Sequence, residues 1–244
     1  MIKGIIFDYG GTIDSRGNHW SWIIRDGWKN AGIDCPLDIF RECYVHAERE
    51  LAKTRHILPG DDFHTLLVKK MRIELQYLAD NYASRTEVKG FEAAQTEALA
   101  RGIAQYCDQC ARQCIEEARP VLEQLSARFP MMLVSNFYGN VDSVLRAYDL
   151  RRYFQGVIES AVVGVRKPDP RIFMLGVVAL GLSPDEVVIV GDSLRKDILP
   201  ARSIGCHTMW IKGHGWTADE DAQTDPAEVK NIAEAFNAIL TLCN

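Results

Sequence analysis

The sequence predicts an α/β fold in which a parallel sheet, covered by helices on both faces, carries an inserted helical domain. From residue 120 onward, short apolar runs alternate with helical patterns, as in the βαβ units of a parallel sheet. Between about residues 20 and 118 the pattern is helical and strand signals are few. We therefore expect a core of residues 1–14 and 119–244 and a helical cap domain over residues 15–118.

The first expected strand is the apolar run at residues 2–7, which ends in an acidic residue and a glycine turn. Asp8 follows the run, and the turn continues through Gly10, Gly11 and Thr12. In open α/β folds, ligands bind at the carboxyl ends of the strands, so Asp8 is the candidate nucleophile. Glycines allow the backbone to approach a ligand closely, and Thr12 adds a hydroxyl.

Polar residues also stand at or behind the ends of later apolar runs. Ser135 and Asn136 close one run, and Asp192 closes another, with Asp197 five residues later. Lys167 stands just before a proline-rich helix entry. Singly, each has a structural interpretation as a helix cap, turn former or solvated charge. Together at strand ends they indicate one site, and the strands expected besides the first cover residues 131–135, 157–160, 187–191 and 207–211.

The inserted segment contains two amphipathic helical patterns, which turn residues 59–62 separate. One face carries Leu37, Phe40, Tyr44, Ala47 and Leu51. The next segment includes Phe63, Leu67, Lys70, Glu74 and Leu78, with Leu66, Met71 and Leu75 widening its apolar stripe. Spacings of three and four residues place such side chains on one side of a helix.

In order and spacing, the segments around Asp8, Ser135, Lys167 and Asp192 resemble the four motifs of the haloacid dehalogenase superfamily of hydrolases. The helical insertion after the first motif is similar to the subclass with an α-helical cap between motifs one and two. The resemblance implies a Rossmann-like core and a phosphatase of a small phosphorylated metabolite. It also implies that Asp8 forms an aspartyl-phosphate intermediate.

The resemblance further implies a Mg²⁺ ion held by Asp8, Asp192 and the backbone carbonyl of Gly10, with Asp197 ordering a metal-bound water. Lys167 would be catalytic and would also contact the phosphate. The other residues implied in phosphate binding are Thr12, Ser135 and Asn136.

One position departs from the phosphatase pattern. Phosphatases of this superfamily carry a second Asp two residues after the nucleophile, and this chain has Gly10 there. Losing an acid–base group typically costs about 10²- to 10⁴-fold in rate. The chain is therefore expected to be a weak phosphatase, or alternatively a catalytically impaired phosphate-ligand binding or regulatory protein. Asp14 is a possible surrogate acid, although its ordinary role is to cap or hinge the entry into the cap.

A third reading is a phosphonatase-like hydrolase of C–P bonds, which uses a cap lysine as a Schiff base. Tyr9-Gly10 is similar to the corresponding pair in such enzymes. Lys53 is the most plausible by position among the candidate lysines Lys29, Lys53, Lys69, Lys70 and Lys89. Dehalogenation is not expected, because relatives that cleave carbon–halogen bonds lack the Gly191-Asp192 metal motif.

The composition of the chain bears on its binding partners and its cellular compartment. A net charge of −5 provides no general attraction to nucleic acid or anionic membranes. No leader and no long uncharged apolar run are visible, so we expect a cytoplasmic protein.

Seven cysteines fit a reducing compartment. Cys107, Cys110 and Cys114 draw one helical stripe, which favours core packing over a metal site. The oligomeric state is left open.

Overall fold

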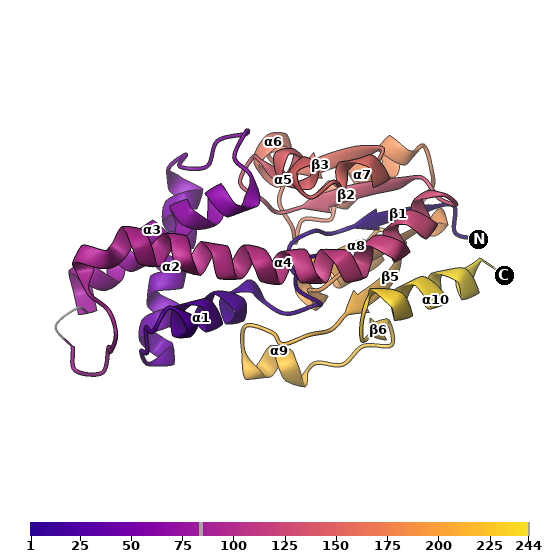
Figure 1. The fold of residues 1–244 in the computed structure, drawn as a ribbon. Coiled ribbons are helices and arrows are strands. Elements are labelled where there is room, and N and C mark those ends of the chain that lie inside the picture. The colour runs from indigo at the N-terminus through magenta and orange to yellow at the C-terminus, as the bar shows by residue number, and fades with distance from the viewer. Residues whose placement is uncertain (83–84, 244) are drawn as a thin grey trace. The chain divides into compact units, whose positions relative to one another are not determined.

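The structure is a computed structural model that describes residues 1–82 and 85–243. The expected cap range also includes residues 83–84, and the expected core range includes residue 244, all of which lie outside the described residues. The chain divides into two compact units (Figure 1). The core unit comprises Met1–His19 and Arg112–Asn244, and the cap unit comprises Trp20–Ala111.

The core unit is built on a six-stranded sheet in the order β3-β2-β1-β4-β5-β6, and all its described pairings are parallel. The predicted α/β class and parallel sheet are confirmed. The sixth strand has only two residues and was not expected from the sequence. The strands are β1 Gly4–Phe7, β2 Met131–Ser135, β3 Gly156–Glu159, β4 Val187–Gly191, β5 His207–Ile211 and β6 Glu228–Val229.

Strand β1 lies between β2 and β4, and all four of its residues are buried. Phe7 pairs with Leu133 of β2 and with Val190 of β4. Parallel strands in this register end at the same edge of the sheet, so the turn after β1 and the loops after β2 and β4 emerge together. On one face, Ile6 packs in a buried cluster with Phe173 of helix α7, Arg171–Leu180.

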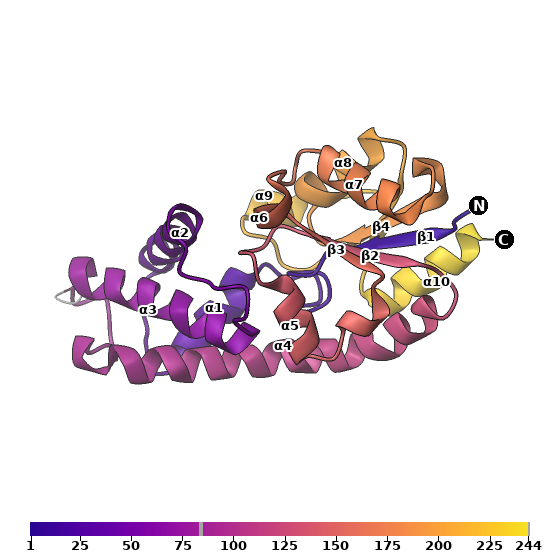
Figure 2. The same ribbon diagram turned by 90° about the horizontal axis from the view of Figure 1, so that it is seen from above.

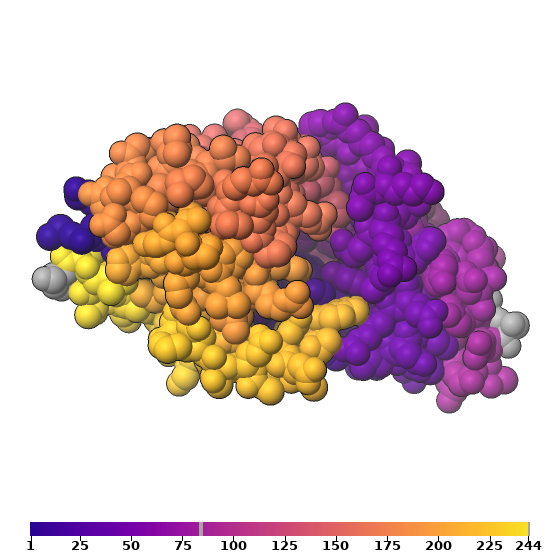
Figure 3. All heavy atoms as spheres, turned by 180° about the vertical axis from the view of Figure 1, so that it is seen from behind, coloured from indigo at the N-terminus to yellow at the C-terminus, as the bar shows by residue number. Residues whose placement is uncertain are grey.

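Helices cover both faces of this sheet. Figure 2 shows α7 and α8 on one face, and α5, α10 and the second half of α4 on the other. On the side drawn in Figure 3, the orange and yellow segments late in the chain form most of the surface of the core unit. Its helices are α5 Val141–Ala147, α6 Ser160–Val163, α7 Arg171–Leu180, α8 Leu199–Ser203, α9 Ala218–Ala222 and α10 Ile232–Leu242, with short helical turns at 151–153, 184–186 and 194–198.

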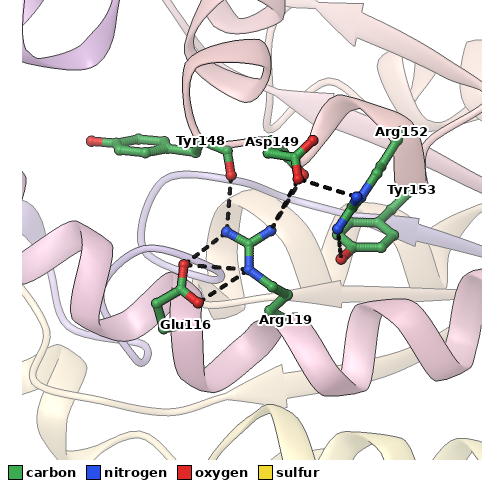
Figure 4. A network of polar contacts seen from close by, with 6 residues as sticks. All are labelled: Glu116, Arg119, Tyr148, Asp149, Arg152 and Tyr153. Carbon is green, nitrogen blue, oxygen red and sulfur yellow. Dashed lines mark hydrogen bonds and ion pairs between the residues drawn. The ribbon is translucent and has the colours of Figure 1, made fainter.

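Helix α4, Thr96–Ser126, begins in the cap unit and ends in the core unit. Within the core unit, Arg119 ties it to the turn after α5 (Figure 4). Its guanidinium donates to the backbone carbonyls of Tyr148 at 3.0 Å and Asp149 at 3.3 Å, and to the Glu116 carboxylate at 2.8 Å. Asp149 has a φ of +56°, so Arg119 satisfies a carbonyl of a strained turn.

The cap unit consists of α1 Trp20–Asn30, α2 Leu37–Lys53, α3 Phe63–Tyr82 and the first half of α4, with a 3-10 turn at Ala93–Gln95. The two predicted helices are confirmed as α2 and α3. Phe40 and Ala47 are buried, as are Leu67 and Leu78, which matches the apolar faces read from the sequence. Two ionisable side chains on the α3 stripe, Lys70 and Glu74, are buried as well.

The cysteine stripe of α4 is a packing feature, because Cys107 and Cys114 are buried and Cys110 is half-buried. Over residues 1–82 and 85–243, no helix has the length and apolarity that crossing a bilayer would require.

Candidate active site

Three acidic side chains converge at the carboxyl edge of the sheet. Asp8 follows β1, Asp192 follows β4, and Asp197 lies in the helical turn Leu194–Ile198 behind β4. One carboxylate oxygen from each lies within 4.8 Å of the others. Asp8 and Asp197 are buried and Asp192 is half-buried. Three carboxylates this close repel one another unless positive charge lies between them.

Lys167 supplies one positive charge. Its Nζ lies 2.8 Å from Oδ1 of Asp8 and 2.7 Å from Oδ1 of Asp197, and its side chain is almost fully buried. Burial by itself lowers the pKa of an ammonium, but the charges of Asp197 and Asp8 outweigh it and raise the pKa of Lys167 above its usual value. Lys167 is therefore a fixed cation at neutral pH.

A single ammonium leaves the cluster short of positive charge. Burial, together with the charges of Asp197 and Asp8, raises the pKa of Asp192 well above its ordinary value. Burial also raises the pKa of Asp197, although Lys167 counteracts it. A divalent cation with a preference for oxygen ligands would restore the balance, so the donor set fits Mg²⁺.

Two glycines allow this crowding. Gly11 has a φ of +101°, and a Cβ there would lie 2.4 Å from Oδ2 of Asp192. A Cβ on Gly191 would lie 2.6 Å from Cγ of Asp197. Any side chain at either position would displace a carboxylate of the cluster.

Gly10 differs from both. No φ in the left-handed range is found there, and a Cβ would meet no atom within 4 Å. The backbone at the position of the missing acid–base residue therefore accepts a side chain without strain.

The hydroxyl and amide residues predicted to bind phosphate lie at the same edge. Thr12 is buried and donates from Oγ1 to Oδ1 of Asp192 at 3.1 Å. Ser135 is buried at the end of β2. The amide of Asn136 makes two bonds to the backbone of Lys167: Oδ1 accepts from its N–H at 3.0 Å, and Nδ2 donates to its carbonyl at 3.1 Å. Asn136 thus fixes the backbone at Lys167.

Asp14, considered as a surrogate acid, is buried, and its Oδ1 accepts from the backbone N–H of Gly11 at 2.8 Å. It braces the glycine turn.

Sequence reasoning missed Trp210, whose indole N–H donates to the backbone carbonyl of Asp192 at 2.7 Å. Trp210 pairs with Gly191 across β4 and β5, and only knowledge of the strand neighbours could have indicated this contact.

Comparison with known proteins agrees with this geometry. A profile of the haloacid dehalogenase-like hydrolases matches residues 2–205 of the chain. The chain belongs to this family of hydrolases. The similarity of motifs read from the sequence is thereby confirmed at the level of the family.

Curated relatives match over a shorter stretch. A phosphoserine phosphatase from Thermus thermophilus is 36% identical over 89 residues, covering 36% of this chain and 35% of that protein. A glyceraldehyde 3-phosphate phosphatase from Pyrococcus furiosus is 37% identical over 82 residues, covering 34% of this chain and 33% of that protein. The chain thus spans about a third of the length of these relatives.

Solved structures match over nearly the whole chain. A HAD-type hydrolase from Bacillus subtilis bound to magnesium has a TM-score of 0.61 at 18% identity, covering 98% of this chain and 99% of that one. A HAD phosphatase from Thermococcus onnurineus has a TM-score of 0.51 at 20% identity, covering 98% of both chains. At these identities the likeness supports the hydrolase fold.

Proposed function

We propose that the protein is a Mg²⁺-dependent phosphatase of a small phosphorylated metabolite and works through an aspartyl-phosphate on Asp8. The observation that carries the proposal is the position of Lys167, whose ammonium bridges Asp8 and Asp197 inside a cluster of three carboxylates. An ammonium fixed beside a nucleophilic carboxylate is suited to receive an anionic phosphoryl group. The phosphatases among the relatives support the choice of substrate class.

The metal would be held by Asp8, Asp192 and the backbone carbonyl of Gly10. When bound, it would neutralise charge on the phosphoryl oxygens. Calorimetry with Mg²⁺ tests this assignment. We expect Asp192→Ala to weaken binding strongly. A matched control is Asp169→Ala, which removes an aspartate that pairs with Arg171 in the loop after Lys167. Equal affinity of wild type and Asp192→Ala would refute the assignment.

In the proposed reaction, a carboxylate oxygen of Asp8 attacks phosphorus and the bond from phosphorus to the leaving oxygen breaks. The leaving oxygen takes a proton from solvent and departs as the alcohol. Water then attacks phosphorus, the bond from phosphorus to the Asp8 oxygen breaks, and inorganic phosphate leaves as the water returns a proton to solvent, regenerating Asp8. Lys167 stabilises the phosphoryl oxygens in both steps. Asp197 uses one oxygen for Lys167 and the other for the backbone N–H of Ser193 at 3.0 Å, so its task is to hold the lysine and to order water rather than to bind the ion directly.

Contacts to the phosphoryl oxygens would come from Lys167 and Ser135. The Thr12 hydroxyl has one proton and donates it to Asp192, so it would reach the substrate only by giving up that bond. Both polar groups of the Asn136 amide bond to the backbone of Lys167, so Asn136 contributes mainly by positioning Lys167.

A specific observation favours a second candidate, a phosphate-binding protein with little turnover. Gly10 offers no group to protonate the leaving alcohol or to activate water. The C–P hydrolase gains no support from the cap lysines. Lys53 is exposed at the end of α2, and Lys70 is buried and paired with Glu48 and Glu74. Those carboxylates help to raise the pKa of Lys70, although burial opposes them, whereas Schiff-base chemistry requires a neutral amine.

A panel of phosphate esters and phosphonates, assayed with and without Mg²⁺, separates these candidates. Turnover of an ester that needs Mg²⁺ and disappears in Asp8→Asn supports the phosphatase. Binding of beryllium fluoride to Asp8 without turnover of any ester supports the binding protein. Beryllium fluoride density elsewhere in a soaked crystal, with Asp8 free, would refute the nucleophile.

A further inference from the structure

A buried glutamate outside the four motifs holds the loop that follows β2. Glu159 is the last residue of β3, is 5% exposed and pairs in register with Ser135 of β2. Its carboxylate accepts three consecutive backbone N–H groups from the loop, those of Gly139, Asn140 at 3.1 Å and Val141 at 3.3 Å. Consecutive backbone N–H groups form a concave site for an anion, and Glu159 fills it from within the chain.

Ser135 ends β2 and Asn136 begins this loop, so the carboxylate fixes the far end of the segment that starts with Asn136. Gly139 has a φ of +97°, a conformation that turns its N–H toward the carboxylate and that side chains rarely tolerate. Three hydrogen bonds to a charged acceptor are stronger than bonds to a neutral one. Burial raises the pKa of Glu159, while the three N–H groups oppose that rise.

The near end of the loop connects to the lysine. Asn136 makes two hydrogen bonds to the backbone of Lys167, whose ammonium lies 2.8 Å from Asp8. A chain of direct contacts therefore runs from Glu159 through the loop and Asn136 to Lys167. Every member of this chain lies in the core unit.

We infer that Glu159 is a positioning residue, which sets the loop at 136–141 and through it the place of Lys167 in the phosphoryl-binding site. This inference rests on the proposed function for its ligand, whereas the coupling between Glu159 and Lys167 can be measured without one. Glu159 does not contact the carboxylate cluster in any hydrogen bond found in the described part of the chain.

The test uses Glu159→Gln, which keeps the shape and removes the charge. Hydrogen–deuterium exchange of the whole protein, without ligand, should speed up at residues 136–141 and at residues 164–168, and stay unchanged at residues 192–198. Unchanged exchange at 164–168 with faster exchange at 136–141 would overturn the coupling. The control Asp142→Asn removes a neighbouring carboxylate that pairs with Arg146 and Arg151 and leaves the three N–H bonds intact.

A second arm measures binding. Affinity for beryllium fluoride in the presence of Mg²⁺ should fall about 5-fold in Glu159→Gln, because a neutral acceptor holds the loop less firmly. Affinity for Mg²⁺ alone should stay the same, since none of its expected ligands lies on the loop. A merely structural role would lower the melting temperature and weaken both affinities, and would overturn the inference.

Two further results keep the outcomes distinct. If wild type fails to bind beryllium fluoride, the proposed function fails, while the exchange experiment still decides the coupling. If Glu159→Gln does not fold, Glu159→Asp replaces it. That variant keeps the charge but is one methylene too short to reach all three N–H groups, and the same change in exchange is expected.

Discussion

Each unit of the molecule buries one lysine among carboxylates. In the core unit, Lys167 lies between Asp8 and Asp197 with Asp192 nearby. In the cap unit, Lys70 pairs with Glu48 and lies 3.4 Å from Glu74, and its ammonium stands 4.1 Å from the centre of the Tyr44 ring. Both clusters set an ammonium among carboxylates, yet only the first cluster is proposed to carry chemistry.

The difference lies in what surrounds the charges. The core cluster forms on turns after strands, with glycines that let the carboxylates converge, and Asp192 is half-buried. The cap cluster forms between side chains of α2 and α3, and Glu74 is fully buried with Lys70 as its ion-pair partner. We therefore assign the proposed chemistry to the cluster on the turns, where carboxylates that follow separate elements converge.

The largest expected effect separates the two clusters by activity. Asp8→Asn should lower kcat for the best phosphate ester by about 10⁴-fold or more, because no other group supplies the nucleophile. The matched change in the cap, Glu74→Gln, should alter kcat by no more than about 2-fold, as expected for a group without contact with the reaction. Initial rates with Mg²⁺ measure both. Comparable losses in the two variants would contradict the division.

Removing each lysine tests which cluster accepts a metal. Lys167→Met and Lys70→Met should each reduce the free energy of unfolding by about 3–5 kcal/mol, because each leaves buried carboxylates without their cation. Saturating Mg²⁺ should stabilise wild type and both variants through the core site, since a ligand stabilises the state that binds it. It should narrow the deficit relative to wild type only in Lys167→Met, where the added cation replaces the lost charge. Urea unfolding with and without Mg²⁺ measures this, with the exposed Lys29→Met as control. Equal recovery in both variants would remove the distinction.

The cap cluster should also make the free energy of unfolding depend on pH. Burial raises the pKa of Glu74 from 4.5 to about 7, although Lys70 opposes the rise. Between these values the folded protein holds a proton that the unfolded chain has released, so stability falls as the pH rises and levels off above about 7. The linked loss is roughly 3 kcal/mol at most.

Urea unfolding from pH 4.5 to 8 in saturating Mg²⁺ measures this dependence. Glu74→Gln cannot ionise and should flatten the profile, whereas the exposed Glu92→Gln should leave it unchanged. A Glu74→Gln profile that still falls like that of wild type would show that another group is responsible.

The smallest expected effect adds a carboxylate to the core cluster. Gly10→Asp should raise kcat on simple phosphate esters by about 10²-fold, less than a native general acid supplies, because its surroundings are not arranged to hold it. The melting temperature should change little, since a side chain at Gly10 meets open space. Gly10→Asn is the matched control, similar in shape but unable to donate or accept the proton. A folded Gly10→Asp variant that binds Mg²⁺ and gains no activity would favour the binding protein.

The sequence was sufficient to predict the α/β class because strong apolar runs such as residues 131–135 and 187–191 are buried strands. The meeting of Asp8 and Asp192 was predictable because parallel strands deliver their ends to one edge. Lys167 lies between α6 and α7, and its place in the site was expected from the resemblance to the family's motifs. Strand β6 was not predictable, since the two residues Glu228 and Val229 carry no periodic signal and owe their conformation to pairing with β5.

Side-chain partnerships were harder to foresee. The spacing of Lys70 and Glu74 placed them on the stripe of α3, but nothing in the periodicity indicated that Glu48 of α2 pairs with Lys70. The contact between Asn136 and Lys167 joins residues 31 positions apart. Such pairs depend on how elements pack and turn, which periodicity within one element cannot reveal.

The open space around Gly10 has a consequence for evolution. At Gly11 and Gly191, any other residue would push aside a carboxylate of the cluster, so exchange there sacrifices the site itself. At Gly10 a Cβ would meet no atom within 4 Å, and a single base change can convert a glycine codon to an aspartate codon. A lineage can therefore gain or lose a proton-transfer group in one step, at a position where the backbone already accepts a side chain.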